Sequence, residues 1–163
     1  MKLVILLALA SITGICAAQA TTQTIPQTAP KADVFSDQDI AAQLATAVQV
    51  AKAKGSGGGT IGDYKTHKIM LSVRTASGGA EVHAHFDDIF VITEGRATLI
   101  TGGTVVDAKT GADGETKGTR IADGTTQAIG KNDIVHIPAG TPHQVIIAPG
   151  DVFKTIVVKV REE

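Results

Sequence analysis

Apolar residues near the start of the patterned part of the chain recur three or four positions apart, which is the spacing of one helix face. These residues are Ile40, Leu44, Ala47, Val48 and Ala51. Ser36 stands where an N-cap is expected, and Gly55 is a typical helix stop. The pattern therefore predicts one amphipathic helix over 37–54, within an N-terminal helical segment that covers 36–55.

From residue 64 onward the pattern changes to short alternating or apolar runs, separated by Gly and Asp turns, and such runs are typical of strands. The predicted strands are 64–75, 80–85, 89–94, 97–101, 104–107, 125–129, 133–138, 143–148 and 152–160. Because no helix intervenes between them, we expect a β-sandwich or barrel domain over 60–163.

Two glycine-rich segments lack this alternation. Residues 55–62 read GSGGGTIG, which contains a G-x-G-x-x-G match. A dinucleotide site needs these glycines after a strand and before a helix, whereas here they follow a helix, so we interpret the segment as a flexible connection. Residues 108–124 are polar and unpatterned, and we expect a long loop that is either a lid or disordered.

The first residues have the pattern of a secretory signal peptide. A lysine precedes an apolar run and then small residues, which predicts a signal peptide over 1–20. The strongly apolar part is shorter than the roughly 20 residues that a membrane span needs. A bulky Ile15 before Cys16 argues against a lipid anchor. We therefore expect a periplasmic or secreted protein, free of the membrane after cleavage, with a flexible linker over 21–35.

Composition excludes two classes of function. The 163 residues include 15 Lys plus Arg, 16 Asp plus Glu and only 3% aromatic residues. A chain without excess positive charge and with few rings offers little to a nucleic acid, so no nucleic-acid partner is expected. The single cysteine lies in the predicted leader, so thiol and disulfide chemistry are excluded for the mature chain.

Three histidines are candidates for a metal site. His83 and His85 stand two apart on a predicted strand, so both imidazoles are expected on one face. Asp88 lies two and four positions before Phe90 and Ile92, which are apolar and expected to point inward, so its side chain is expected on the same face of the strand. We interpret Asp88 either as a metal ligand or as a solvated acid in a turn. His143 begins another predicted strand after a Pro/Gly-rich turn, which fixes the direction of its side chain.

These segments resemble two motifs of the cupin superfamily, G-x5-H-x-H-x(3,4)-E-x6-G and G-x5-P-x-G-x2-H-x3-N. The first resemblance runs from Gly78 to Gly95 and includes His83, His85 and Asp88. The second consists of Asn132, Pro138, Gly140 and His143. Counting back from Gly95 puts Asp88 at the glutamate position of the family.

The resemblance implies an all-β fold, a small antiparallel jelly-roll barrel, preceded here by the helix. It also implies a divalent transition metal (Mn, Fe, Ni, Cu or Zn) held by His83, His85, His143 and Asp88. Glu81 shares the parity of the first two histidines and is a candidate general base. Three further cations, Lys65, Arg74 and Arg96, are interpreted either as binding an anionic substrate or as exposed strand charges.

Three functions are compatible with this resemblance. The leading hypothesis is a metal-dependent enzyme of dioxygenase, isomerase or lyase type, acting on a small oxygenated organic molecule. The alternative is a non-catalytic module that binds or senses a metal or small ligand. In a third version the site is vestigial and the barrel is a dimerisation unit. We expect a homodimer, as is frequent in the family.

Overall fold

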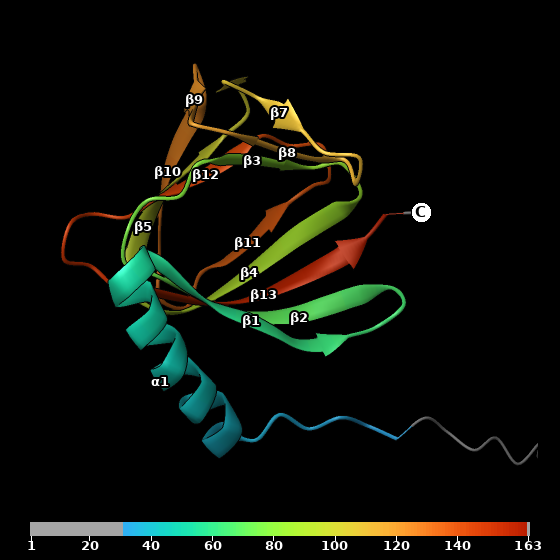
Figure 1. The fold of residues 1–163 in the computed structure, drawn as a ribbon, viewed down its shortest axis with the longest axis vertical. Coiled ribbons are helices and arrows are strands. Elements are labelled where there is room, and N and C mark those ends of the chain that lie inside the picture. The colour runs from blue at the N-terminus through green and yellow to red at the C-terminus, as the bar shows by residue number, and fades with distance from the viewer. Residues whose placement is uncertain (1–30, 163) are drawn as a thin grey trace, which may run out of the picture. The chain divides into compact units, whose positions relative to one another are not determined.

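The computed structural model describes residues 31–162 (Figure 1). The predicted signal peptide and most of the predicted linker, residues 21–30, lie outside this range. The described residues from Val34 onward form one compact unit. No helix among the described residues is both long and apolar enough to cross a membrane.

The single helix of the described region, α1 (Asp37–Lys54), has the predicted bounds and both predicted caps. The Asp39 backbone N–H donates to the Ser36 hydroxyl at 3.2 Å. Gly55 adopts a left-handed conformation with φ of 85° and donates its N–H to the Ala51 carbonyl at 2.7 Å. A residue without a Cβ is favoured there, which explains why the helix ends at this glycine.

The strands form two antiparallel sheets that face each other (Figure 1). The five-stranded sheet has the order β1 (Ser56–Asp63), β2 (His67–Arg74), β13 (Phe153–Arg161), β4 (Phe86–Glu94) and β11 (Ile134–Ile137). The six-stranded sheet has the order β10 (Thr125–Gly130), β5 (Arg96–Thr101), β12 (His143–Ile146), β3 (Ala80–His83), β8 (Glu115–Gly118) and β7 (Lys109–Thr110). A short pair consists of β6 (Thr104–Val106) and β9 (Arg120–Ala122). The predicted jelly-roll architecture with one preceding helix is confirmed.

Apolar side chains form two separate clusters. The larger one fills part of the space between the sheets and consists of Phe90, Ile92, Ala97, Leu99, Ile129, Ile137, Val145, Ile147, Phe153 and Val157. The smaller one lies between α1 and the five-stranded sheet and consists of Ala47, Ala51 and Val73, with Leu44, Val48 and Val152 packed against them. The five-stranded sheet is therefore covered by side chains on both faces.

The expected flexible connection at 55–62 is wrong, because these residues form β1, which pairs with β2 along its length. Its glycines allow neighbouring backbones to approach closely. A Cβ at Gly57 would lie 2.2 Å from the Ala47 carbonyl oxygen of α1, and one at Gly58 would lie 2.0 Å from the Leu71 carbonyl oxygen. The strand is specified by contact with the helix and not by side-chain alternation, so periodicity could not reveal it.

The expected long loop at 108–124 is also wrong, since this segment contains β7, β8 and β9. Strand β8 pairs with β3 and places Glu115 opposite His83. The ladder with β3 satisfies the backbone of this polar strand, so it does not need an apolar pattern. The segment is part of the wall around the candidate site.

Candidate metal centre and its cavity

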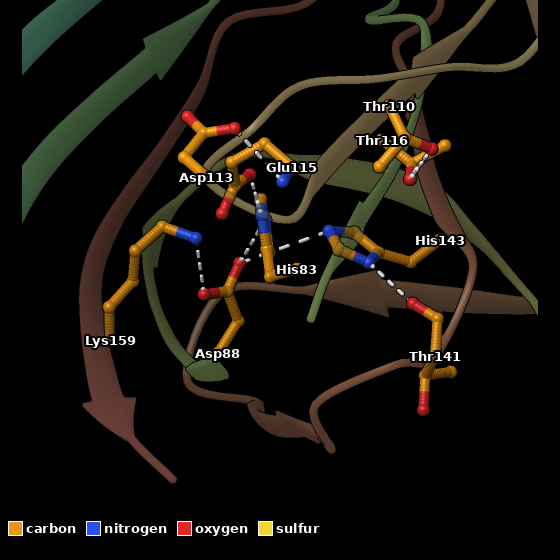
Figure 2. A network of polar contacts seen from close by, with 9 residues as sticks. All are labelled: His83, Asp88, Thr110, Asp113, Glu115, Thr116, Thr141, His143 and Lys159. Atoms are coloured by element: carbon orange, nitrogen blue, oxygen red, sulfur yellow. Dashed lines mark hydrogen bonds and ion pairs between the residues drawn. The ribbon is translucent and has the colours of Figure 1, made fainter. Parts of the chain in front are cut away.

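A cavity of about 310 Å³ lies between the two sheets. Its lining includes inward-facing side chains of β2, β3, β4, β8, β12 and β13. One part of this lining is apolar and belongs to the larger core. Another part is strongly polar and contains Glu81, His83, Asp88, Glu115, His143 and Lys159. Figure 2 shows all of these except Glu81.

His83 is the last residue of β3 and is buried between two carboxylates. Its Nδ1 lies in hydrogen-bond contact with Oε2 of Glu115, on the neighbouring strand β8. Its Nε2 lies 3.3 Å from Oδ2 of Asp88. When the imidazole is neutral, donation from Nδ1 to Glu115 leaves the Nε2 lone pair facing the cavity.

His143 opens β12 and has the same orientation toward Asp88. Its Nδ1 donates to the Thr141 carbonyl at 3.0 Å, and its Nε2 lies 3.8 Å from Oδ2 of Asp88. The preceding turn is held to β3, because the Gly140 N–H donates to the His83 carbonyl at 2.8 Å. Gly140 has φ of 75°, so a residue without a Cβ suits this turn and the direction it gives to His143.

Asp88 lies on the inward face of β4, as its parity with Phe90 predicted, and only 3% of it is exposed. Its register partner on β13 is Lys159, whose ammonium group donates to Oδ1 at 2.7 Å. Because Lys159 occupies Oδ1, Oδ2 remains directed at the two imidazoles (Figure 2). The reading of Asp88 as a solvated turn acid is therefore wrong.

The charges of this network shift the pKa values in different directions. Burial alone lowers the pKa of His83, but the hydrogen bond and charge of Asp88 outweigh it, so that the pKa lies above its usual value. Burial would raise the pKa of Asp88, yet His83 and Lys159 hold it below its usual value. Burial, with the nearby His83, lowers the pKa of His143. The network therefore favours a carboxylate at Asp88 and a neutral imidazole at His143.

Glu81 completes a group of three potential ligands. One ligand atom each from Glu81, His83 and His143 lies within 4.8 Å of the others. Glu81 is the register partner of His143 across the β3–β12 pair, and it precedes His83 by two residues on the same face of β3. Its carboxylate is thus placed among the imidazoles and does not stand apart as a general base would.

The structure does not bring His85 into this group. Strand β3 ends at His83, and His85 lies in the following turn with an exposed side chain. The prediction that His83 and His85 share one face of a strand is wrong. Period-two alternation holds only within a strand, and the chain turns into β4 at Phe86.

This correction shifts the motif by two positions. Glu81 and His83 then take the H-x-H positions, with Glu81 replacing the first histidine. Four residues separate His83 from Asp88 and six separate Asp88 from Gly95, which matches the spacing of the cupin motif. The sequence signal was present, because the spacing counted from Gly95 suits His83 as the second histidine better than His85.

Two residues of the site were missed by the sequence reasoning. Glu115 lies in the segment taken for a loop, and only its pairing with β3 brings it to His83. Lys159, on the last strand, was not singled out from the sequence. Its inward parity with Phe153, Thr155 and Val157 was the available signal.

The other two histidines lie away from the cavity lining. The His67 ring stacks on Tyr64, with the ring centroids 4.7 Å apart. His136 is exposed, and its Nε2 lies 3.0 Å from Oδ2 of Asp87. Asp87 also accepts the Ala139 N–H at 2.7 Å and has a lowered pKa, because His136 and this N–H stabilise its charge.

The donor set suits a divalent transition metal. Two imidazole nitrogens and one or two carboxylate oxygens are ligands for ions such as Mn, Fe, Ni, Cu and Zn. The outer nitrogen of each imidazole is already bound to a carboxylate or a backbone carbonyl, which is the arrangement that orients metal-binding histidines. The residues present therefore fit the metal that the fold suggests.

The fold is similar to solved structures. A Bacillus halodurans protein superimposes with a TM-score of 0.54 at 16% identity, covering 85% of this chain and 88% of that one. The cupin domain of Schizosaccharomyces pombe Cnp3 superimposes with a TM-score of 0.51 at 9% identity, covering 67% of this chain and 66% of that one. No protein-family model and no curated protein matches the sequence. The comparisons thus show the cupin fold that the sequence motifs indicated.

Proposed function

We propose that this cupin-fold chain binds one divalent transition metal and is a metal-dependent enzyme acting on a small oxygenated organic molecule. The ligands are His83, His143 and Glu81, with Asp88 as the fourth donor. The observation that carries the proposal is the convergence of two imidazole Nε2 atoms on one buried carboxylate oxygen, at 3.3 and 3.8 Å. An Mn, Fe, Ni, Cu or Zn ion would supply Lewis acidity there and, for the redox-active ions, oxygen chemistry.

The residues around the ligands fix and balance the site. Glu115 accepts the Nδ1 hydrogen of His83 and so keeps Nε2 free for the metal. Lys159 neutralises one oxygen of Asp88, which limits the negative charge on the cavity wall. The cavity volume of about 310 Å³ is at the lower end of the range of roughly 300–1,000 Å³ for small-molecule sites. A small substrate is therefore favoured over a polymer.

The experiment that tests metal binding is elemental analysis of protein purified without added metal. We expect close to one transition metal ion per chain in the wild type and little in the variants His83→Ala and His143→Ala. The matched controls are His67→Ala and His136→Ala, which remove histidines outside the cavity lining and should retain the metal. Equal metal content in all five proteins would contradict the assignment.

The alternative is a binding or sensing module without turnover, and one observation favours it. Glu81, the expected general base, lies among the ligands, while Lys159 and Glu115 are paired with Asp88 and His83. Few titratable groups of the cavity then remain to move protons. A compound that raises the melting temperature of the metal-loaded protein should reappear as a product by mass spectrometry if the chain is an enzyme, and unchanged if it is a binding module.

We extend the proposal to export and to a homodimer. Export rests on the leader pattern of residues 1–20, and cell fractionation should find the mature protein outside the cytoplasm. The dimer rests on β1, which is an edge strand of the five-stranded sheet and has one side free for pairing among the described residues. Light scattering at micromolar concentration should give twice the chain mass; a monomer mass would remove this part of the proposal.

A further inference from the structure

The cavity wall carries equal numbers of acidic and basic side chains, but not all of them form ion pairs with one another. Three carboxylates and three cationic groups line the cavity: Glu81, Asp88, Glu115, Arg74, Lys117 and Lys159. Lys159 pairs with Asp88, and Glu115 pairs with His83. Within residues 31–162, neither Arg74 nor Lys117 has a hydrogen-bond or ion-pair partner.

Of these two cations, Arg74 is the better placed for recognition. Lys117 is exposed, whereas Arg74 is half-buried at the end of β2. The guanidinium lies against the backbone of Gly78, since a Cβ there would be 2.5 Å from Nη1 of Arg74. The Gly78 backbone is itself fixed, because its N–H donates to the Val145 carbonyl at 3.1 Å and its carbonyl accepts from Gln144 at 2.9 Å. The guanidinium therefore packs against a backbone segment that is held in place by hydrogen bonds.

Further polar groups open to the cavity lie beside Arg74. Ser72 has the same inward parity on β2, and Thr155 is its register partner on β13. In the described part of the chain, neither hydroxyl makes a hydrogen bond to the protein. Arg74, Ser72 and Thr155 thus form a polar patch, which we call the Arg74 patch, on the five-stranded sheet.

The distance between the Arg74 patch and the proposed metal ligands follows from the course of the chain into β3. Strand β3 runs from the Gly78–Gly79 end, where Arg74 rests, through Glu81 to His83. Glu81 follows Gly78 by three positions, which corresponds to about 10 Å of extended chain. One ligand of a few bonds in length can therefore contact both the guanidinium and the metal-binding group.

We infer that the substrate or ligand of the proposed metal site is a small carboxylate, whose anionic group pairs with Arg74 while its oxygen-bearing end faces Glu81, His83 and His143. This inference rests on the proposed function. With three carboxylates against three cations on the wall, a bound divalent ion leaves an excess of two positive charges, which an anionic ligand reduces. The fork of a guanidinium also matches the two oxygens of a carboxylate.

The test is calorimetric titration of the Co²⁺-loaded protein with three hydroxy acids of increasing length: glycolate, 3-hydroxypropanoate and 4-hydroxybutanoate. Each is compared with its uncharged amide. We expect at least one acid to bind the wild type at least tenfold more tightly than its amide. In Arg74→Met this preference should fall by about 10- to 100-fold, the scale of a lost charged hydrogen bond, and in Arg74→Lys it should fall less.

The matched control is Arg96→Met, because Arg96 is an exposed strand arginine outside the cavity lining. It should retain the wild-type preference. A wild type that binds no acid better than its amide, or an Arg74→Met variant that keeps the preference, would overturn the inference. Co²⁺ affinity is measured separately for each variant, and the titrations are repeated without metal. Failure of the wild type to bind Co²⁺ would refute the proposed function, while the acid–amide comparison would still decide the role of Arg74.

Discussion

Side chains of the five-stranded sheet point alternately to its two faces, and these faces differ in role: one packs on α1, and the other lines the cavity. On β2, Leu71 and Val73 are buried on the face toward α1, whereas Ser72 and Arg74 line the cavity. On β13 the inward face even places Lys159 in the barrel. The outer face of β2 thus carries buried apolar residues, whereas its inner face carries Ser72 and Arg74 together with Met70. Burial alone therefore does not tell which face of a strand carries the chemistry.

This comparison separates stability from binding. The outer face joins helix and sheet through apolar contacts, so its substitutions should change the free energy of unfolding. The polar part of the inner face holds Asp88, Lys159 and the Arg74 patch, all of which line the cavity, so substitutions there should change ligand affinity first.

The largest effect is expected from His143→Ala, on strand β12 of the six-stranded sheet, which lies across the cavity from the inner face of the five-stranded sheet. Loss of one of the proposed imidazole ligands should weaken metal binding by more than the roughly 10- to 100-fold typical of groups that only support a ligand. The metal-free variant should still unfold cooperatively. Metal titration followed by calorimetry measures the affinity, and an affinity within threefold of the wild type would contradict the separation.

Leu71→Ala should act on the outer face instead. Leu71 is 2% exposed, and removal of a buried leucine side chain costs about 2–5 kcal/mol in the free energy of unfolding. Metal affinity should stay within about twofold of the wild type, because the side chain points away from the cavity. Urea denaturation measures the free energy of unfolding. Ile134→Ala is the control, since Ile134 is 72% exposed and should cost less than about 0.5 kcal/mol.

Gly57→Ala tests the close approach of α1 to β1. The added Cβ would lie 2.2 Å from the Ala47 carbonyl oxygen, so the helix must move outward, at a cost of about 1–3 kcal/mol. Gly59→Ala on the same strand is the matched control, because its Cβ meets no atom within 4 Å. In thermal melts, Gly57→Ala should unfold at a lower temperature than Gly59→Ala. Equal melting temperatures would show that the packing of α1 on β1 does not require a glycine at position 57.

The smallest effect is expected from Lys159→Met. Lys159 and His83 hold the pKa of Asp88 down, so this carboxylate contributes stability that is present above about pH 4 and is lost as the pH falls through its lowered pKa. Without Lys159 the pKa of Asp88 rises, and acid unfolding of the metal-free protein should begin at a higher pH. A metal ion can replace the lost positive charge, so the metal-induced rise in melting temperature should exceed that of the wild type.

The sequence was sufficient where local rules decide the structure. The helix and its caps follow from Ser36, Gly55 and the apolar spacing, and the inward parity of Asp88 follows from strand alternation. The barrel architecture and the positions of His83 and His143 also follow from the motifs. These features depend on residues that are close in the chain.

The remaining features depend on contacts between distant segments. Strand β1 exists because glycines accept the helix backbone, and β8 exists because it pairs with β3. His85 was placed in the site because nothing local shows that β3 ends at His83. Glu115 reaches the site only through the pairing of β8 with β3, which no single-sequence periodicity records. Strand parity gives the inward direction of Lys159, but only the pairing of β13 with β4 brings it to Asp88.

A crystal structure of the metal-loaded protein, with anomalous scattering measured at the absorption edge of the bound metal, tests the proposed metal site most directly. We expect one strong peak in the cavity, about 2.0–2.2 Å from Nε2 of His83 and of His143 and close to the Glu81 carboxylate. A peak at His67, His85 or His136 with none in the cavity would contradict it.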